Sequence, residues 1–237
     1  PGKEPPLFNI LSGTSQACPH VSGLAATLKS WHPTWTSSAI RSAIMTTAIQ
    51  KNNLHAPITT NNGTRATPYD IGAGEQNLFG PLWPGLVYET ETSDYVQFLC
   101  NYGYNAFVIK YIASTVPNNF SCPSNSSPDL IPDMNYPSIA VFGLKVNGRR
   151  TVRRTVTNVG EGCSIYTASV EAPAGMLVQV VPKILRFTKA VTKQSFQVTF
   201  IPSPTSKGTL FGSITRSSIH NKVRSPFAVA MHDHEKS

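Results

Sequence analysis

The sequence has few charged residues and no long apolar run. Charged residues make up only 14% of its 237 positions. No segment approaches the roughly 20 consecutive apolar residues that a membrane-spanning helix needs, so we expect no membrane span. The opening residues PGKEPP lack the charged start and the apolar centre of a signal peptide. We therefore expect the chain to begin inside a longer polypeptide.

Acidic residues are scarce relative to basic ones. The sequence has 20 Lys and Arg against 12 Asp and Glu, which gives a formal net charge of +8. Its one dense basic run is GRRTVRRTV, residues 148–156, where Thr and Val stand between arginines. This alternation predicts a strand with charge on one side, and no aromatic residues are interleaved for base stacking. We therefore expect no nucleic-acid partner.

Cysteine is also rare, with only four in the chain: Cys18, Cys100, Cys122 and Cys163. Cys100 and Cys122 flank a loop-like segment and are a plausible disulfide. Three Asn-x-Ser/Thr triplets stand among turn-forming residues and are candidate glycosylation sites, at Asn62, Asn119 and Asn125. Together these features favour an oxidising compartment and a secreted protein. Cys163 has no expected partner, and Cys18 is expected to fill space on an apolar helix.

The first half of the chain is expected to be helical with long loops. Residues 15–30 and 37–48 have helical spacing, the second with Thr36 or Ser37 as its N-cap. Residues 51–90 are rich in Asn, Thr, Gly and Pro and are expected to form loops, after which helical spacing returns over 93–113.

The second half is expected to be a β-sandwich. From about residue 135 onward, short segments rich in Val, Thr and Phe recur about every ten residues between turn signals. Seven such strands suggest two packed sheets of the immunoglobulin or fibronectin type III kind. They are expected over 138–144, 149–158, 164–172, 176–187, 194–201, 210–217 and 222–230.

The segment SGTSQACPHVSG, residues 12–23, places a serine where a helix begins. Gly13 allows a tight turn, and Ser15 then lies where unpaired backbone N–H groups and the positive end of the helix dipole gather. A nucleophile there gains an oxyanion site, because its own N–H can donate to a tetrahedral intermediate. Pro19 is expected in the first turn, which needs no N–H donors. By position alone, the simpler interpretation is that Ser15 caps a buried helix.

The letters of this segment favour the catalytic interpretation. SGTSQACPHVSG resembles the catalytic-serine block of subtilisin-like serine proteases, the S8 peptidase family. The similarity continues through YDIGAG, PGLVYE, NYPSIAV and RTVTNVG, which resemble the plant, cucumisin-like branch, and it covers nearly the whole chain.

This resemblance implies a serine endopeptidase. Ser15 would be the nucleophile that forms an acyl-enzyme, with its backbone N–H as one oxyanion donor and with Gly13 and Thr14 shaping the substrate cleft. The substrates would be peptides or proteins, and neither a cofactor nor a metal is implied. Members of this family are usually secreted and glycosylated, in plants to the apoplast or cell wall.

The resemblance also implies a division of the chain. Residues 1–92 would be the C-terminal portion of an α/β subtilisin-like catalytic domain, mainly its helices and loops. Residues 93–132 would be a helical linker, residues 133–231 a fibronectin type III-like sandwich that packs on the catalytic domain, and residues 232–237 a polar tail.

The remaining catalytic groups are expected upstream. In the subtilisin order, Asp and His precede the serine, and the 14 residues before Ser15 contain neither. Asn9 stands too near the serine to be the oxyanion asparagine. His20 lies about 140° around the helix from Ser15 and is expected to be structural. We therefore expect a missing N-terminal part of the catalytic domain, and a chain that is inactive alone.

Other interpretations of these residues remain. Asp70, Asp94 and Asp133 stand at turn or cap positions, where acidic residues are ordinarily structural. An α/β-hydrolase would need Gly-x-Ser-x-Gly and an alternating series of strands and helices, and neither is present. Departures from the family pattern, such as Arg216 where Trp is frequent, keep a second function open. That function is a non-enzymatic secreted glycoprotein or pseudoprotease whose sandwich mediates protein contacts.

Overall fold

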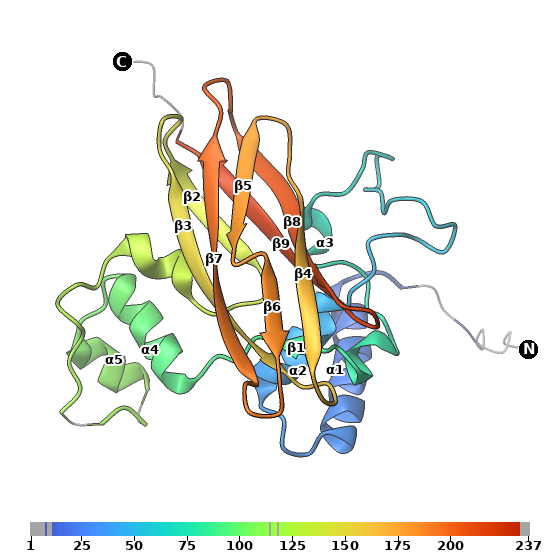
Figure 1. Ribbon diagram of the computed structural model, residues 1–237, viewed down its shortest axis with the longest axis horizontal. Helices are drawn as coiled ribbons and strands as arrows, with labels where there is room; N and C mark the ends of the chain where they lie inside the picture. The colour runs from blue at the N-terminus through green and yellow to red at the C-terminus, as the bar shows by residue number, and fades with distance from the viewer. Residues whose placement is uncertain (1–7, 9–10, 114, 118, 233–237) are drawn as a thin grey trace, which may run out of the picture.

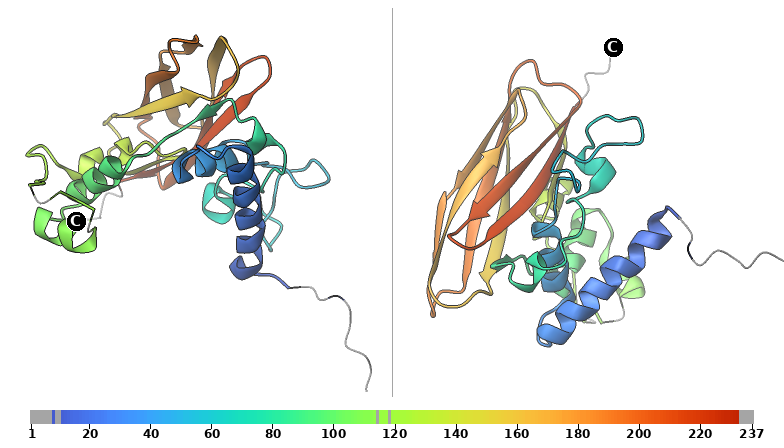
Figure 2. Two further views of the ribbon diagram at one scale, coloured as in Figure 1. Left: turned by 90° about the horizontal axis from the view of Figure 1, so that it is seen from below. Right: turned by 90° about the vertical axis from the view of Figure 1, so that its right-hand side faces the viewer.

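A two-sheet β-sandwich with helices along one side forms the chain (Figure 1). The computed structural model describes residues 8, 11–113, 115–117 and 119–232. The helices and the long loops of the first half lie against the sandwich, as the edge-on view shows (Figure 2). Among the described residues, no helix is both long enough and apolar enough to cross a membrane.

The sandwich has a four-stranded and a five-stranded sheet. The first has the order β1-β3-β7-β5, with bounds Leu86–Val87, Arg150–Asn158, Lys193–Pro202 and Met176–Val181. The second has the order β2-β9-β8-β4-β6, with bounds Ile139–Leu144, Lys222–Met231, Thr209–Ser217, Ser164–Glu171 and Ile184–Phe187. Strands β2 and β9 run parallel, and the other neighbours pair antiparallel. The expected sandwich is confirmed.

Alternating burial along the strands places the core between the two sheets. On β7, Phe196, Val198 and Phe200 are buried while the residues between them are more exposed. This period of two is what a sheet with one covered face requires. The rings of Phe200 and Phe227 meet across the core, with their centroids 5.1 Å apart.

Two strand predictions were wrong. The segment 176–187 forms two strands, β5 and β6, which lie in different sheets. Pro182 separates them, and because proline has no N–H it cannot continue a ladder. Residues 86–87, expected as loop, form β1, which pairs with β3. Leu86 and Tyr88 are buried in the sandwich core, so the chain enters the sandwich well before residue 133.

Five α-helices and two 3-10 helices occur in the described residues. They are α1 (Thr14–Trp31), α2 (Ser37–Thr46), α3 (Pro68–Ile71), η1 (Gly80–Leu82), α4 (Thr92–Asn101), α5 (Ala106–Ile112) and η2 (Pro128–Asp133). Thr36 caps α2, since its hydroxyl accepts from the N–H of Ala39 at 3.1 Å. Loops occupy most of residues 51–90, as expected.

Helix α2 attaches the helical half to the sandwich. Its buried Ser42 accepts the backbone N–H of Tyr88 at 2.8 Å, and its buried Ser38 accepts that of Thr90 at 3.0 Å. Ala43 packs against Val87 of β1. These hydrogen bonds satisfy two buried donors just beyond β1, so α2 takes the place of a neighbouring strand there.

The basic run does not keep its charge on one side of the strand. Arg154 points inward between Val152 and Val156 and is only 3% exposed. Its guanidinium donates to the carbonyls of Pro132, Arg153, Tyr136 and Ser138 at 2.7 to 3.0 Å. Burial lowers its pKa to about 10. The expectation failed because these carbonyls take the place of water around the buried cation.

Candidate active-site serine

Ser15 is the second residue of α1, which begins directly after a glycine, Gly13, that no other residue can readily replace. Gly13 has φ 148° and ψ 164°, a region of backbone space that is essentially restricted to glycine. A Cβ at this position would lie 2.9 Å from Oε1 of Gln16. The carbonyl of Gly13 accepts from the N–H groups of Gln16 and Ala17 at 3.1 and 3.2 Å. The glycine therefore sets the sharp turn that begins the helix.

The backbone N–H of Ser15 is available to a ligand. Within the described residues, neither this N–H nor the Ser15 hydroxyl has a hydrogen-bond partner. Residues 11–23 are all exposed, and the first buried side chains on α1 are Leu24 and Leu28. Figure 2 shows the amino-terminal half of α1 extending beyond the elements on which its other end packs. A free donor therefore stands at the positive end of the helix dipole.

The other residues of this segment are placed as follows. Nδ1 of His20 lies 2.8 Å from the carbonyl oxygen of Gln16, so the ring is held on its own helix, as a structural role predicts. Cys18 is exposed, and the expectation that it fills space was wrong, because none of the described residues covers this half of α1. Pro19 lies inside α1 beyond the first turn, which also differs from the prediction.

The carboxylates of Asp70, Asp94 and Asp133 have structural roles. Asp70 forms a capping box with Thr67, and the hydrogen bond from the Thr67 N–H lowers the pKa of this carboxyl. Asp94 accepts the N–H of Glu91 at the start of α4 at 2.8 Å. Asp133 accepts the N–H of Arg153 at 2.8 Å and so ties η2 to β3. None of them reaches Ser15 by a hydrogen bond, and Asn9 and residues 233–237 lie outside the described residues.

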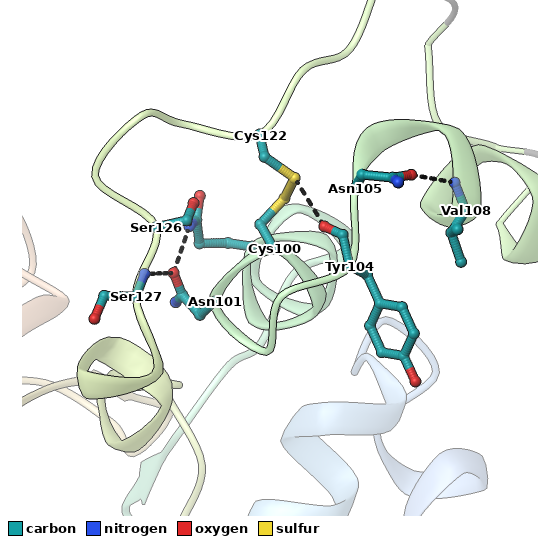
Figure 3. Close-up of a disulfide and its surroundings, with 9 residues drawn as sticks. Cys100, Asn101, Tyr104, Asn105, Val108, Cys122, Ser126 and Ser127 are labelled. Atoms are coloured by element: carbon teal, nitrogen blue, oxygen red, sulfur yellow. Dashed lines mark hydrogen bonds between the residues drawn. A yellow bond between two sulfur atoms is a disulfide. The ribbon is translucent and has the colours of Figure 1, made fainter.

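The expected disulfide is present (Figure 3). It joins Cys100 near the end of α4 to Cys122 in the loop between α5 and η2, with the two Cα atoms 5.6 Å apart. Cys163 is free and exposed. The candidate glycosylation sites all lie in turns with exposed side chains, at Asn62, Asn119 and Asn125.

Comparison with known proteins agrees with this arrangement. Residues 5–74, which contain the serine segment, match the model of the subtilase family, and residues 133–229 match a fibronectin type-III domain. A CO(2)-response secreted protease of Arabidopsis thaliana is 52% identical over 230 residues, which are 97% of this chain and 30% of that protein. The chain belongs to the subtilase family.

Further subtilases align over most of the chain. Subtilisin-like protease SBT5.1 of Arabidopsis thaliana is 50% identical over 100% of this chain and 31% of its own length. A subtilisin-like serine-protease S of Lotus japonicus is 42% identical over 94% of this chain and 29% of its own length. The chain thus spans about 30% of the length of these curated relatives. Among solved structures, a family 123 glycoside hydrolase from Clostridium perfringens aligns over 46% of this chain and 25% of its own, with 9% identity and a TM-score of 0.36.

Proposed function

We propose that Ser15 is the nucleophile of a subtilisin-like serine endopeptidase. The observation that carries the proposal is the exposure of Ser15 in the first turn of α1. Its backbone N–H has no partner among the described residues, and the turn before it has a conformation essentially restricted to glycine. An ordinary helix cap stands before the first turn and uses its side chain to satisfy an N–H of the helix. Ser15 makes no such bond in the described residues, so capping does not explain it.

The geometry suits attack on a peptide carbonyl. The hydroxyl oxygen of Ser15 would bond to the scissile carbonyl carbon, while its proton passes to the histidine of the triad. The N–H of Ser15 would donate to the oxygen that becomes negative, and the amino end of α1 would stabilise the same charge. Thr14 and Gly13 would line the adjacent cleft. The C–N bond then breaks, the leaving amine takes the proton from the histidine, and water hydrolyses the acyl-enzyme to free the serine and the acid. The substrates are peptides or proteins.

The histidine, the aspartate and the oxyanion asparagine would come from a preceding part of the catalytic domain. We propose that this preceding part packs on the exposed amino-terminal half of α1. Apolar side chains stand there in contact with solvent, among them Ala17 and Val21, the latter 43% exposed. Burying them would stabilise the complete domain by the usual hydrophobic term. We expect the chain by itself to hydrolyse no peptide bond above background.

The sandwich would position the catalytic half and carry no chemistry itself. Its firm attachment through Ser38 and Ser42 of α2 supports this role. We also propose that the protein is secreted to the plant apoplast or cell wall. The disulfide and the three exposed candidate glycosylation sites suit that location, and one relative is named as a secreted protease.

Active-site labelling tests the nucleophile. The protein in its longest natural form is treated with a fluorophosphonate probe, and we expect one labelled serine, Ser15. Ser15→Ala should abolish the label, whereas Ser22→Ala, which changes an exposed serine of the same helix, should leave it unchanged. A label that survives Ser15→Ala places the nucleophile elsewhere. A properly folded wild-type protein that takes no label at all favours the non-enzymatic glycoprotein.

A further inference from the structure

A polar groove lies beside the sandwich, away from Ser15. It has a volume of about 830 Å³ and runs between helix α4, the 3-10 helix η2 and strands β3 and β7. Figure 1 shows α4 and the segment that follows it beside β3. Ligand sites in proteins commonly have volumes of about 300–1,000 Å³, so the groove is large enough for a small ligand.

The side chains of this groove suit a sugar. Its walls combine carboxylates, amides, hydroxyls and basic groups with one aromatic ring, and representative residues are Asp94, Gln97, Phe98, Thr155 and Lys193. Each hydroxyl of a sugar both donates and accepts hydrogen bonds, so it is matched by a wall that offers both functions. The C–H face of a sugar ring packs on an aromatic face, which Phe98 can offer.

One candidate glycosylation site belongs to the groove itself. Asn125 lines it and has an exposed side chain, whereas neither Asn62 nor Asn119 is among the lining residues. Asn125 also opens the triplet Asn-Ser-Ser. A glycan attached at Asn125 would therefore begin at the wall of the groove.

The loop that carries Asn125 is held in place. The side-chain amide of Gln97 donates to the hydroxyl of Ser126 at 3.3 Å, and Asn101 accepts the N–H of Ser127 at 3.4 Å (Figure 3). The disulfide between Cys100 and Cys122 ties the same loop to α4 a few residues earlier. Because the anchor is fixed, a sugar attached there has a high effective concentration in the groove.

We propose that the groove holds the first sugars of an N-linked glycan attached at Asn125. Attachment joins the amide nitrogen of Asn125 to the anomeric carbon of N-acetylglucosamine from a lipid-linked diphosphate oligosaccharide donor. The diphosphate leaves and the amide loses one proton. The glycan then connects α4 and η2 with the four-stranded sheet and shields β3 and β7 from solvent. This inference rests on the proposed secretion.

Glycan mapping combined with hydroxyl-radical footprinting tests the proposal. The protein in its longest natural form is secreted from plant cells, and mass spectrometry measures glycan occupancy and the oxidation of Phe98 and Met134, which both line the groove. We expect Asn125 to be occupied. Asn125→Gln, or enzymatic removal of glycans from the folded wild type, should raise oxidation of both residues severalfold. Asn62→Gln, the matched control, should not change it.

Three outcomes would overturn the proposal. If a glycan is found at Asn62 but not at Asn125, the groove has no attached glycan to hold. If the oxidation of Phe98 and Met134 does not change after deglycosylation, the glycan at Asn125 lies in solvent and not in the groove. Protection of the Asn125→Gln protein by micromolar β-1,4-linked glucan oligosaccharides assigns the groove to an external polysaccharide instead. Labelling of Ser15 is measured on the same samples. A protein that labels normally but lacks the protection refutes the groove assignment alone, and one that is protected but takes no label refutes the catalytic role alone.

Discussion

Gly13→Ala is expected to impair the active-site serine without unfolding the protein. The backbone at Gly13 has φ 148° and ψ 164°, and a residue with a Cβ there costs about 1–3 kcal/mol. The new Cβ would also lie 2.9 Å from Oε1 of Gln16, but this is the end of a flexible side chain that can rotate away. The backbone strain therefore dominates the cost.

Strain of that size lowers the equilibrium constant for the native conformation of the turn by roughly 5- to 150-fold. The N–H of Ser15 moves with the turn, and losing one oxyanion donor costs on the order of 10²- to 10³-fold in other proteases. We expect the rate of fluorophosphonate labelling to fall by about one to two orders of magnitude. The far-UV circular dichroism spectrum should stay as in the wild type, because the strain is confined to the turn at Gly13 and the core of the sandwich contains no residue of α1.

The assay uses the protein in its longest natural form and compares labelling rates with urea unfolding and far-UV circular dichroism on the same preparations. Gly162→Ala is the matched control, because Gly162 also has a positive φ, 71°, has no atoms within 4 Å of the built Cβ, and lies in the sandwich half of the chain. It should label at the wild-type rate. If Gly13→Ala also labels at that rate with its fold intact, the turn does not position the nucleophile and our reasoning about this segment is wrong.

Three further predictions concern stability. Cys122→Ser opens a disulfide with a sequence separation of 22 and should lower the free energy of unfolding by about 3.4 kcal/mol, measured with urea. Ser42→Ala leaves the buried N–H of Tyr88 without an acceptor and should cost about 1–3 kcal/mol in the same assay. Glu89 accepts a hydrogen bond from Thr157. Desolvation raises the pKa of Glu89, but hydrogen bonds to Thr157 and Lys193 outweigh it, so the pKa is lowered overall. This stabilisation is present above the unfolded pKa of about 4.5 and is lost as the pH falls through the lower, folded-state pKa. Glu89→Gln should therefore cost about 0.5 kcal/mol at pH 7, and the cost should shrink as the pH falls below 4.5.

Each stability variant has an exposed counterpart that should behave as wild type. These controls are Cys163→Ser for the disulfide, Ser93→Ala for the buried hydroxyl and Glu161→Gln for the carboxylate. Equal losses in a variant and its control would mean that the named bond is not the cause. A Glu89→Gln loss that persists unchanged at pH 3 would contradict the assigned ionisation.

The start of α1 and the serine segment were predictable from sequence because their cause is local. Gly13 and Ser15 lie within one turn of chain, and the backbone needs only neighbouring residues to adopt that shape. The cap at Thr36 and the alternating burial of β7 were predictable for the same reason. The split at Pro182 was missed, although the proline itself signalled a break in the ladder.

Other features depend on residues far apart in the chain. Arg154 is buried because carbonyls of the η2 region reach it, and no strand pattern reveals those partners. Arg216 on β8 is likewise buried. Its guanidinium carbon lies 4.0 Å from the ring centre of Phe196 on β7, which belongs to the other sheet. The polar groove appears only when α4 is brought beside β3.

The order of residues alone therefore determined where the helices begin, which strand faces are apolar, which two cysteines pair and which serine belongs to the subtilase block. Short-range backbone geometry and side-chain periodicity are enough for these. Only the tertiary structure decided that β1 joins the sandwich, that two arginines lie in its interior and that Asn125 stands at a groove. Each of these depends on packing between segments that are separated along the chain, and that packing decides which polar groups find partners when water is excluded.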